Sequence, residues 1–434
     1  MKITFIQPST NSWKSSGAIQ PLVFGILADM TPDNIELAFY DDRIEEVPVD
    51  EPTDLVAMSV ETHTASRAYT IADRYLRRNI PVIMGGYHPT LCPDEVLSRA
   101  ISVAMGDAET IWTDIVRDAC SGQLKSIYKA KKISGQLKTS VNRSIYKGKK
   151  YAPIHAVQWG RGCPYNCDFC SINAFYNNAQ CIRTISDVTT ELEKLGEKTV
   201  LFIDDNLYHD KKALIQFVQA ITPYRLKWVC QISIDITSDI RIMKLLEKSG
   251  CKALVVGFES FNRENLKQMN KGWNTSHHDY DTAVRIISDH GIMIYGTFVF
   301  GYDYDTVDSF NICLDFALRS KFCIANFNPL TPTPGTRLYE RLKKENRLIY
   351  PEWWIDPDYR YGEAIFQPSR MTAKELTEGC FRIRKSFNKN SSIFTRLIDP
   401  RANLSSFYNL WIFLLANYLN RKEIYKKQGQ KLGD

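Results

Sequence analysis

Short apolar runs alternate with amphipathic runs along the first part of the chain. Five continuous apolar runs predict β-strands, at residues 3–7, 35–40, 55–59, 81–85 and 102–106. Three runs with helical periodicity lie between them, at residues 21–29, 64–78 and 93–99, and a fourth follows the last strand at residues 110–119. Strands that are apolar on both faces are typical of a parallel sheet covered by helices on both sides. The pattern therefore predicts an α/β fold with a doubly wound domain over residues 1–125.

The alternation stops at residues 126–153, which are rich in Lys, Ser and Gly, and we expect a linker there. Six further strands are predicted after it, at residues 154–159, 199–204, 228–232, 253–258, 293–300 and 324–327. Five helices are predicted between these strands, at residues 186–195, 211–221, 240–249, 280–290 and 306–320. Six β/α repeats are too few for a closed eight-stranded barrel. They favour a partial (β/α)6 barrel over residues 154–335.

The last part of the chain, residues 336–434, predicts a C-terminal helical cap over the barrel mouth. Trp353 and Trp354 either line a substrate pocket or pack between elements, and packing is the interpretation we favour. Residues 407–419 are strongly apolar and precede a basic stretch. Docking on a membrane surface is one interpretation of that pattern, and a buried helix with a solvated basic end is the one we favour.

Composition narrows the class of protein. Of 434 residues, 44% are hydrophobic, which is enough for sizeable cores, and the net charge of +6 is mild. A nucleic-acid-binding protein would show a more clustered basic excess. Eleven cysteines cannot all pair, which favours a reducing cytoplasm. The N-terminus predicts a strand rather than a signal peptide, and no run approaches the roughly 18 apolar residues of a transmembrane segment.

Three cysteines stand at C-x3-C-x2-C spacing in the run Arg161-Gly-Cys-Pro-Tyr-Asn-Cys-Asp-Phe-Cys170. Three thiolates can bind three irons of a four-iron cluster and leave the fourth iron open for a ligand. A structural zinc site needs a fourth protein ligand, and no second cysteine pair or histidine pair follows at short range. Cys163, Cys167 and Cys170 are therefore predicted to ligate an iron–sulfur cluster. The alternative is three unrelated loop cysteines.

This run resembles the cluster motif of the radical S-adenosylmethionine (SAM) superfamily. The resemblance implies a 4Fe-4S cluster that binds SAM and cleaves it reductively to a 5′-deoxyadenosyl radical. It also implies SAM contacts at the carboxyl ends of the barrel strands. The cofactor-binding candidates on this basis are Phe169, Asp204, Glu259, Ser260 and Gly296. Phe169 lies between two of the cysteines and could shield the cluster as well as approach the adenine.

The first domain resembles the cobalamin-binding domain that precedes the cluster domain in one large radical SAM subclass. The resemblance lies in Tyr40-Asp-Asp-Arg43, in Ser59 after a predicted strand, and in the run Gly85-Gly-Tyr-His-Pro-Thr90. It implies that Ser59, Gly85 and Gly86 contact cobalamin.

The chain lacks one sequence motif that supplies the lower ligand of cobalt in that subclass. Members that ligate cobalt through histidine carry D-x-H-x-x-G, whereas this chain has Ser12-Trp-Lys-Ser-Ser-Gly17. The resemblance therefore implies base-off cobalamin without that histidine. His63, in the loop after the third predicted strand, is a candidate cofactor-binding residue in its place, although an isolated histidine is more often a satisfied polar group.

The resemblance implies a cobalamin-dependent, class B methylase-like radical SAM enzyme. One SAM would methylate cobalamin, and a second would yield the radical that removes hydrogen from an unactivated substrate carbon. No side chain is assigned a catalytic role. The implied partners are a small-molecule or lipid-like substrate and an external electron donor such as flavodoxin or ferredoxin. Cyclisation or rearrangement without methyl transfer, and an iron–sulfur electron-transfer protein, are the alternatives.

Overall fold

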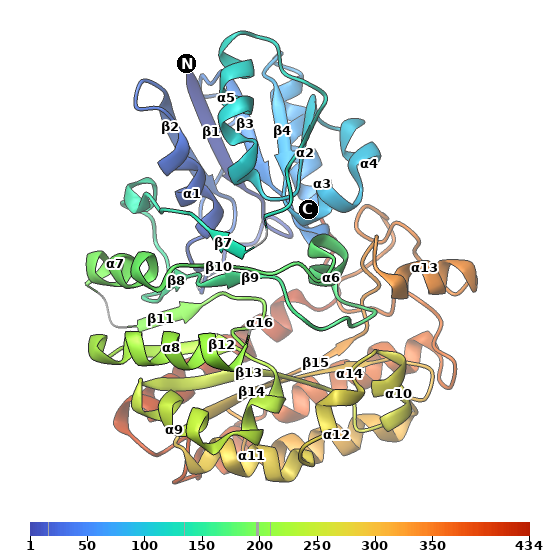
Figure 1. Cartoon of the computed structure of the whole chain (residues 1–434). Helices are drawn as coiled ribbons and strands as arrows, with labels where there is room; N and C mark the ends of the chain where they lie inside the picture. Colours follow the sequence, from blue (N-terminus) through green and yellow to red (C-terminus); the bar gives the residue numbers. More distant parts are fainter. Residues whose placement is uncertain (16, 134, 197–198, 209) are drawn as a thin grey trace.

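Six parallel strands form the first sheet (Figure 1). The structure, a computed structural model, describes the whole chain except residues 16, 134, 197–198 and 209. The strands occur in the order β2-β1-β3-β4-β5-β6. Their bounds are Lys2–Gln7 (β1), Glu36–Asp41 (β2), Leu55–Ser59 (β3), Val82–Gly85 (β4), Ser102–Met105 (β5) and Ile127–Lys129 (β6).

Helices cover both faces of this sheet. Helices α1 (Leu22–Met30) and α5 (Trp112–Cys120) pack on one face, and α2 (Ala65–Leu76) packs on the other. Phe5 belongs to the first of these cores and Ile6 to the second, because successive side chains of a strand point to opposite faces. The short helices α3 (Tyr87–Leu91) and α4 (Pro93–Leu97) follow β4. The doubly wound fold predicted here is confirmed.

Short strands occupy the stretch that we expected to be a linker. Strand β6 begins at residue 127, and its Tyr128 is buried and donates a hydrogen bond to Asp118. A separate three-stranded sheet has the order β7-β10-β9, with bounds Gly135–Leu137, Cys181–Arg183 and Gly160–Arg161. Strands of two or three residues are too short for a periodic pattern, so sequence analysis missed them. Residue 134 of this stretch lies outside the described residues.

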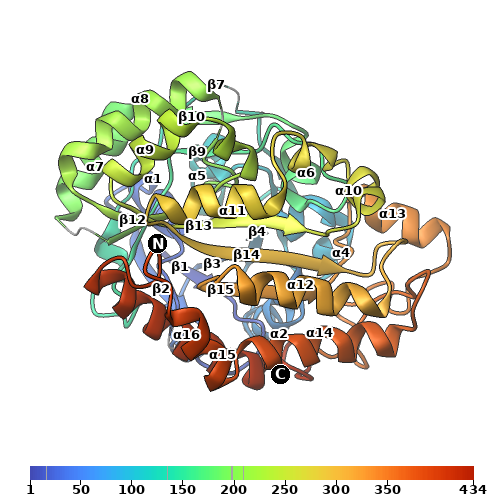
Figure 2. The same ribbon diagram turned by 90° about the horizontal axis from the view of Figure 1, so that it is seen from below.

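The second six-stranded parallel sheet has the order β15-β14-β13-β12-β11-β8. Its strands are His155–Val157 (β8), Thr199–Phe202 (β11), Lys227–Gln231 (β12), Cys251–Glu259 (β13), Met293–Phe300 (β14) and Ile324–Pro329 (β15). The helices among these strands are α6 (Ser171–Tyr176), α7 (Ile185–Leu195), α8 (Lys211–Ile221), α9 (Ile240–Lys248), α10 (Arg263–Gln268), α11 (Tyr280–Asp289) and α12 (Val307–Arg319). Figure 2 shows α11 and α12 on the outer side of the curved sheet. The partial barrel is confirmed.

The C-terminal part is helical, as predicted, but not all of its helices lie over the barrel mouth. They are α13 (Arg337–Lys344), α14 (Ala373–Phe387), α15 (Asn390–Leu397) and α16 (Phe407–Lys427). Helix α14 packs along β15 and α12. Arg396 of α15 donates to the carbonyls of Phe322 and Cys323, just before β15 begins. These hydrogen bonds hold α15 at the amino end of the sheet, opposite to the mouth.

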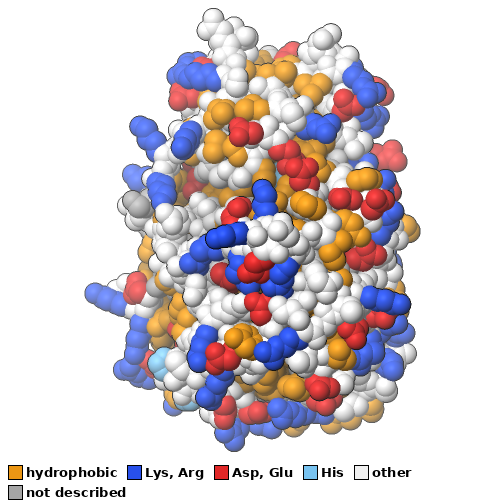
Figure 3. Space-filling view, turned by 90° about the vertical axis from the view of Figure 1, so that its right-hand side faces the viewer, with side chains coloured by type: hydrophobic (Ala, Val, Ile, Leu, Met, Phe, Trp, Pro, Cys, Tyr) orange, Lys and Arg blue, Asp and Glu red, His pale blue; other side chains and the backbone are white. Residues whose placement is uncertain are grey.

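Trp353 and Trp354 are buried in the core beneath α2, so packing, the favoured interpretation, describes them. Their indole nitrogens donate to Pro332 and Glu95 respectively. On the face that carries α13, acidic and basic side chains are interspersed (Figure 3). In the described part of the chain, no helix has both the length and the apolar character needed to cross a bilayer.

A buried arginine joins the two domains. Arg161 of β9 pairs with Asp107 (Nη1–Oδ1, 2.9 Å) and Glu109 (Nη2–Oε1, 2.5 Å), both in the loop between β5 and α5. Its Nε also donates to Gln158 (2.8 Å). All three charged side chains are nearly excluded from solvent, at 9 to 12% exposure. Removing one member of such a group leaves the other charges buried and unpaired.

Replacement of Arg161 by Met should therefore lower the free energy of unfolding by about 3–5 kcal/mol. The matched control is Arg241→Met, because Arg241 pairs with Asp239 through a guanidinium that is mostly exposed. The control should change stability by less than about 1 kcal/mol. Urea unfolding of both variants measures the difference, and equal stabilities would contradict the role given to Arg161.

Candidate active site

The barrel strands leave one face open. In β11 to β15, residues that face the helices are buried, whereas the alternate residues are partly exposed although they lie in the middle of the molecule. The parallel register aligns Val255 with Tyr295, and Gly257 with Thr297 and Asn326. Because side chains alternate along a strand, these partly exposed residues share one face. They line an open lumen.

The three motif cysteines lie in the loop between β9 and α6 at the edge of this lumen. Cys163, Cys167 and Cys170 are partly buried and form no disulfide. Burial raises the pKa of all three thiols, that of Cys167 to about 12. Cys163 acts electrostatically on Cys167 and Cys170, and Cys170 acts on Cys167. Such thiols remain protonated unless a metal replaces the proton.

A buried ion pair lies beside the cysteine loop. Lys271 Nζ is 2.7 Å from Glu259 Oε1, and the two side chains are about one-tenth exposed or less. Burial opposes the charge of Lys271, but Glu259, Cys167 and Cys170 outweigh it and raise the lysine pKa. Glu259 has a positive φ of 62° at an irregularity between β13 and β14. This backbone conformation is uncommon outside glycine and turns the carboxylate toward Lys271.

Two carboxylates after β11 hold the backbone that leads to the cysteines. Asp204 is buried and accepts hydrogen bonds from the amides of Trp159 (3.0 Å) and Gly160. Asp205 accepts from the amide of Gly162 (2.8 Å). The carboxylate of Asp204 thus already has two backbone donors. Its predicted contact with SAM stays a prediction.

The other predicted SAM contacts lie in different surroundings. Ser260 is buried, and its Oγ accepts from the amide of Asn262 at the start of α10. Phe169 meets Tyr302 edge to face, with 6.4 Å between the ring centroids. Gly296 lies on the helix-facing side of β14, where a Cβ atom would come within 2.4 Å of the Phe322 ring. Strand alternation thus turns Gly296 away from the lumen, and its predicted contact with SAM stays a prediction.

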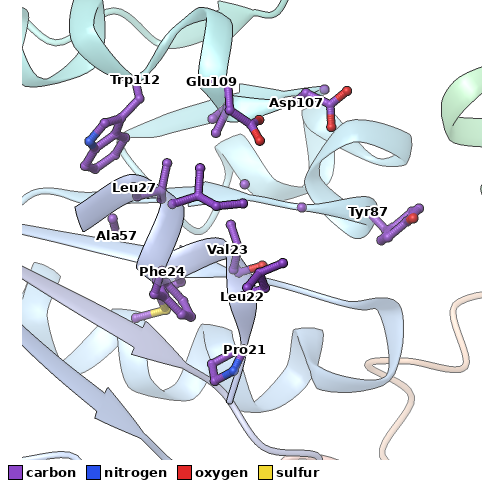
Figure 4. A pocket seen from close by; sticks show the side chains of 18 of the residues that line it. Pro21, Leu22, Val23, Phe24, Leu27, Ala57, Tyr87, Asp107, Glu109 and Trp112 are labelled. Carbon is purple, nitrogen blue, oxygen red and sulfur yellow. The ribbon is translucent and has the colours of Figure 1, made fainter. Parts of the chain in front are cut away.

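A cavity of about 400 Å³ opens at the carboxyl ends of the first sheet (Figure 4). Its inner wall is apolar and includes Phe24 and Leu27 of α1 and Trp112 of α5. Asp107, Glu109 and Tyr87 form part of its polar rim. Ser59, Gly85 and Gly86 line it from the first domain, and Gln158, Arg161 and Asp205 line it from the barrel side. The cavity therefore lies between the two domains.

Gly86 allows the chain to turn at the wall of this cavity. It has a φ of +105°, and a Cβ atom there would lie 2.9 Å from the carbonyl oxygen of Val60. A side chain would both strain the backbone and fill the space over β3 and β4. The three cofactor contacts predicted for the first domain thus meet at one cavity.

His63 is not among the residues that line this cavity. Its ring packs against Trp353, with 4.6 Å between centroids, and lies 6.2 Å from Tyr361. Burial, with a smaller contribution from Lys427, lowers the His63 pKa to about 4. The structure therefore does not bring His63 together with Ser59 and Gly86. In the stretch 12–17, position 16 lies outside the described residues.

A second cavity, of about 440 Å³, adjoins the first and shares Gln7 and Glu61 with it. Burial and the nearby Asp205 raise the pKa of Glu61 to about 7. The lining also includes basic side chains from the two ends of the chain, Lys14, Arg43, Lys426 and Lys427.

Lys271 and Arg161 are site residues that no local sequence pattern indicated, although Arg161 immediately precedes the Gly-Cys of the cluster motif.

Comparison with known proteins agrees with this geometry. A family model of the radical SAM superfamily matches residues 157–317, and one of the B12 binding domain matches residues 23–116. A bacteriochlorophyllide d C-12(1)-methyltransferase of Chlorobaculum tepidum is 30% identical over 97% of this chain and 93% of its own length. The chain belongs to the cobalamin-dependent radical SAM methyltransferases.

Other members of this family are more distant. A hopanoid C-2 methylase of Rhodopseudomonas palustris is 25% identical over 75% of this chain and 65% of its own length. The solved structure of TsrM from Kitasatospora setae, a radical SAM methyltransferase with cobalamin and a 4Fe-4S cluster bound, gives a TM-score of 0.66 at 14% identity and covers 98% of both chains. At that identity the likeness concerns the fold alone.

The partly buried, neutral imidazole of His63 makes stability depend on pH. In the unfolded chain this histidine takes up a proton below about pH 6.5, whereas in the folded chain it does so only near pH 4. Stability is therefore lost as the pH falls from 6.5 toward 4, by about 3 kcal/mol. His63→Phe keeps an aromatic ring against Trp353 and should lose correspondingly less over this window.

Urea unfolding at pH 6.5 and pH 4.5 measures this difference. The exposed His277 provides the control, since His277→Phe should keep the pH dependence of the unmodified protein. If His63→Phe lost as much stability on acidification as the control, the imidazole of His63 would not be the group responsible.

Proposed function

We propose that Cys163, Cys167 and Cys170 hold the 4Fe-4S cluster at the mouth of the barrel, and that the cavity between the domains holds the corrin ring of cobalamin. The observation that carries this proposal is the composition of the cavity wall. Ser59 and Gly86 of the first domain face Arg161 and Asp205, which lie next to the cysteine loop. Two cofactors bound in this way would lie next to each other.

The residues beside the cysteines suit a cluster that binds SAM. Lys271 places a buried positive charge beside Cys167 and Cys170, which offsets the negative charge of thiolates and of a SAM carboxylate. Asn206 Nδ2 lies 3.8 Å from Cys163 Sγ, close enough to donate a hydrogen bond to this sulfur. Glu259 and Asp204 are proposed to contribute through the groups that they hold, Lys271 and the backbone before the cluster loop.

The cavity wall suits a cofactor with an apolar body and amide side chains. The wall under α1 and α5 is apolar, and the rim carries Asp107, Glu109 and Arg161 as hydrogen-bonding groups. Glycine at position 86 lets the backbone approach a large planar ligand. The bound cofactors supply the radical and the methyl group, while the protein excludes water and holds the reacting atoms in line.

The lumen favours an apolar substrate of small-molecule or lipid-like size. Among its partly exposed residues are Leu201, Val229, Val255 and Val299. A polar pair, Asn326 Nδ2 donating to Tyr295 Oη at 2.6 Å, could orient a single polar group. Relatives that act on bacteriochlorophyllide d and on hopanoids support this substrate class.

The electron for SAM cleavage is proposed to come from an external donor such as flavodoxin or ferredoxin. A cavity of about 510 Å³ is lined by Cys167 and Cys170 and extends to Asn166 and Arg337. It offers a short path from the protein surface to the cluster, and Arg337 lends it a positive charge that suits an acidic partner.

Radical chemistry without methyl transfer is the second candidate. It is favoured by an anaerobic magnesium-protoporphyrin IX monomethyl ester cyclase of Cereibacter sphaeroides, which is 25% identical over 54% of this chain. Incubation of the reconstituted enzyme with methyl-deuterated SAM and an apolar substrate extract separates the two candidates. Transfer of the labelled methyl group to a product supports methylation, whereas SAM cleavage with an unlabelled, altered product supports the second candidate.

Replacement of any motif cysteine by Ala should abolish cluster retention and formation of 5′-deoxyadenosine, because two thiolates cannot hold the cluster firmly. Iron content and nucleoside chromatography after anaerobic reconstitution give the readout. Cys120→Ala is the control, since Cys120 is exposed and lies in α5. SAM cleavage retained by a motif variant would overturn the cluster assignment.

A bulky residue in the cavity should prevent the binding of cobalamin and leave the 4Fe-4S cluster in place. Ala108 lines the cavity at the start of a short 3-10 helix, so Ala108→Trp should fill part of it. We expect at least a tenfold loss of cobalamin retention, read from the visible spectrum after desalting, with SAM cleavage intact. Ala108→Ser is the size-matched control and should retain cobalamin. Full retention by Ala108→Trp would place cobalamin elsewhere.

A further inference from the structure

Helix α16 presents its apolar side chains to solvent. The residues that it buries are Asn409, Phe413 and Asn417, two of which carry amides. Its exposed large side chains recur every three or four residues through three turns and again at its end, at Phe407 (84% exposed), Trp411 (47%), Leu414 (47%), Tyr418 (66%) and Tyr425 (52%). We call these five residues the α16 stripe. The favoured prediction of a buried apolar helix was therefore wrong.

Hydrogen bonds of the buried amides fix this orientation. Asn409 Nδ2 donates to the carbonyls of Ala402 (2.9 Å) and Gly291 (3.2 Å). Asn417 donates to the carbonyl of Cys323 (3.1 Å) and accepts from Arg396 (2.9 Å). Rotating the helix to bury the stripe would break these four hydrogen bonds and move both buried amides away from their partners. The apolar face is therefore held outward by the fold.

The stripe is accompanied by further exposed apolar residues and by positive charge. Phe394 of α15, Ile398 directly after it, and Leu404 are 65%, 55% and 40% exposed. Residues 389–427, which hold α15 and α16, carry seven basic side chains, of which only Arg396 is fully buried, and two acidic ones, a net charge of +5 against +6 for the whole chain. An aromatic and aliphatic stripe with a basic surround is typical of helices that lie in the plane of a bilayer surface.

We propose that the α16 stripe docks on the surface of a bilayer that contains anionic lipids. Trp411 and Tyr418 have the amphipathic rings that favour the headgroup region, and Lys422 follows them at helical spacing on the exposed side. The positive charge of residues 389–427 argues against a second copy of this chain as the partner that covers the α16 stripe. A two-fold contact through the stripe would bring two segments of net charge +5 together.

The far end of α16 leads to the reaction site. Lys426 and Lys427, in its last turn, line the second cavity, which shares Gln7 and Glu61 with the cobalamin cavity. Docking would thus hold an entrance of the site beside the bilayer, where an apolar substrate concentrates. This route rests on the proposed function, whereas the docking itself does not.

Vesicle sedimentation of the full-length reconstituted protein, without substrate, tests the docking. Vesicles of phosphatidylcholine with phosphatidylglycerol should bind the protein at least tenfold better than vesicles of phosphatidylcholine alone. The variant Trp411→Ser/Leu414→Ser/Tyr418→Ser should lose at least tenfold in binding to the anionic vesicles. The matched control is Ile101→Ser/Ile240→Ser/Val307→Ser, which removes three similarly exposed apolar side chains elsewhere and should bind as the unmodified protein does.

Formation of 5′-deoxyadenosine in detergent-free buffer shows that each variant is folded, because that reaction does not require the bilayer. Unmodified protein that ignores anionic vesicles, or a stripe variant that binds as well as the control, overturns the proposal. A dimer of the unmodified protein, detected by analytical ultracentrifugation and lost only in the stripe variant, would also overturn the proposal. A protein that docks on vesicles but fails to transfer methyl would contradict the proposed function and leave the docking intact.

Discussion

A buried guanidinium holds the two halves of the site together. Arg161 lies one residue before Gly162 and two before Cys163, and it pairs across the domain boundary with Asp107 and Glu109. Burial raises the pKa of Asp107 even with Arg161 beside it, so these charges lie where water solvates them poorly. An ion pair in such surroundings is favourable only when its geometry is well satisfied. The position of the cluster loop relative to the cavity therefore depends on this contact.

Two carboxylates after β11 fix the backbone of the site, as Arg161 fixes the domain boundary, through polar contacts. Asp204 and Asp205 accept amides of residues 159, 160 and 162, which connect β8 to the cluster loop. A loop that must present three thiolates to one cluster gains from such fixed anchors, because disorder in the loop would have to be lost on binding. Acidic residues at strand ends thus position the site through the backbone, and need not touch a cofactor to matter.

The larger strands could be predicted because each buries at least one apolar face. Apolar runs revealed all the strands of the two large sheets except β6, and the C-x3-C-x2-C spacing revealed the cluster loop, since both signals are local. Lys271 and Arg161 acquire their roles from partners brought together by folding, Glu259 and Asp107 among them, so no local pattern identifies them. The side of β14 on which Gly296 lies could not be predicted for a related reason, because the face of a strand residue depends on register.

Helix α16 illustrates a competition between the burial of apolar side chains and the hydrogen bonds of buried amides. An apolar sequence pattern does not reveal this competition. Each buried hydrogen-bonding group left without a partner costs about 1–3 kcal/mol. Burying one large apolar side chain contributes about 1.5–3 kcal/mol, so the two tendencies are of similar size. In this chain Asn409 and Asn417 decide the orientation, because their partners, Gly291, Ala402 and Cys323, have fixed positions around the sheet. The exposed stripe is then a stable property of the fold, and a bilayer surface would recover the apolar burial that water denies it.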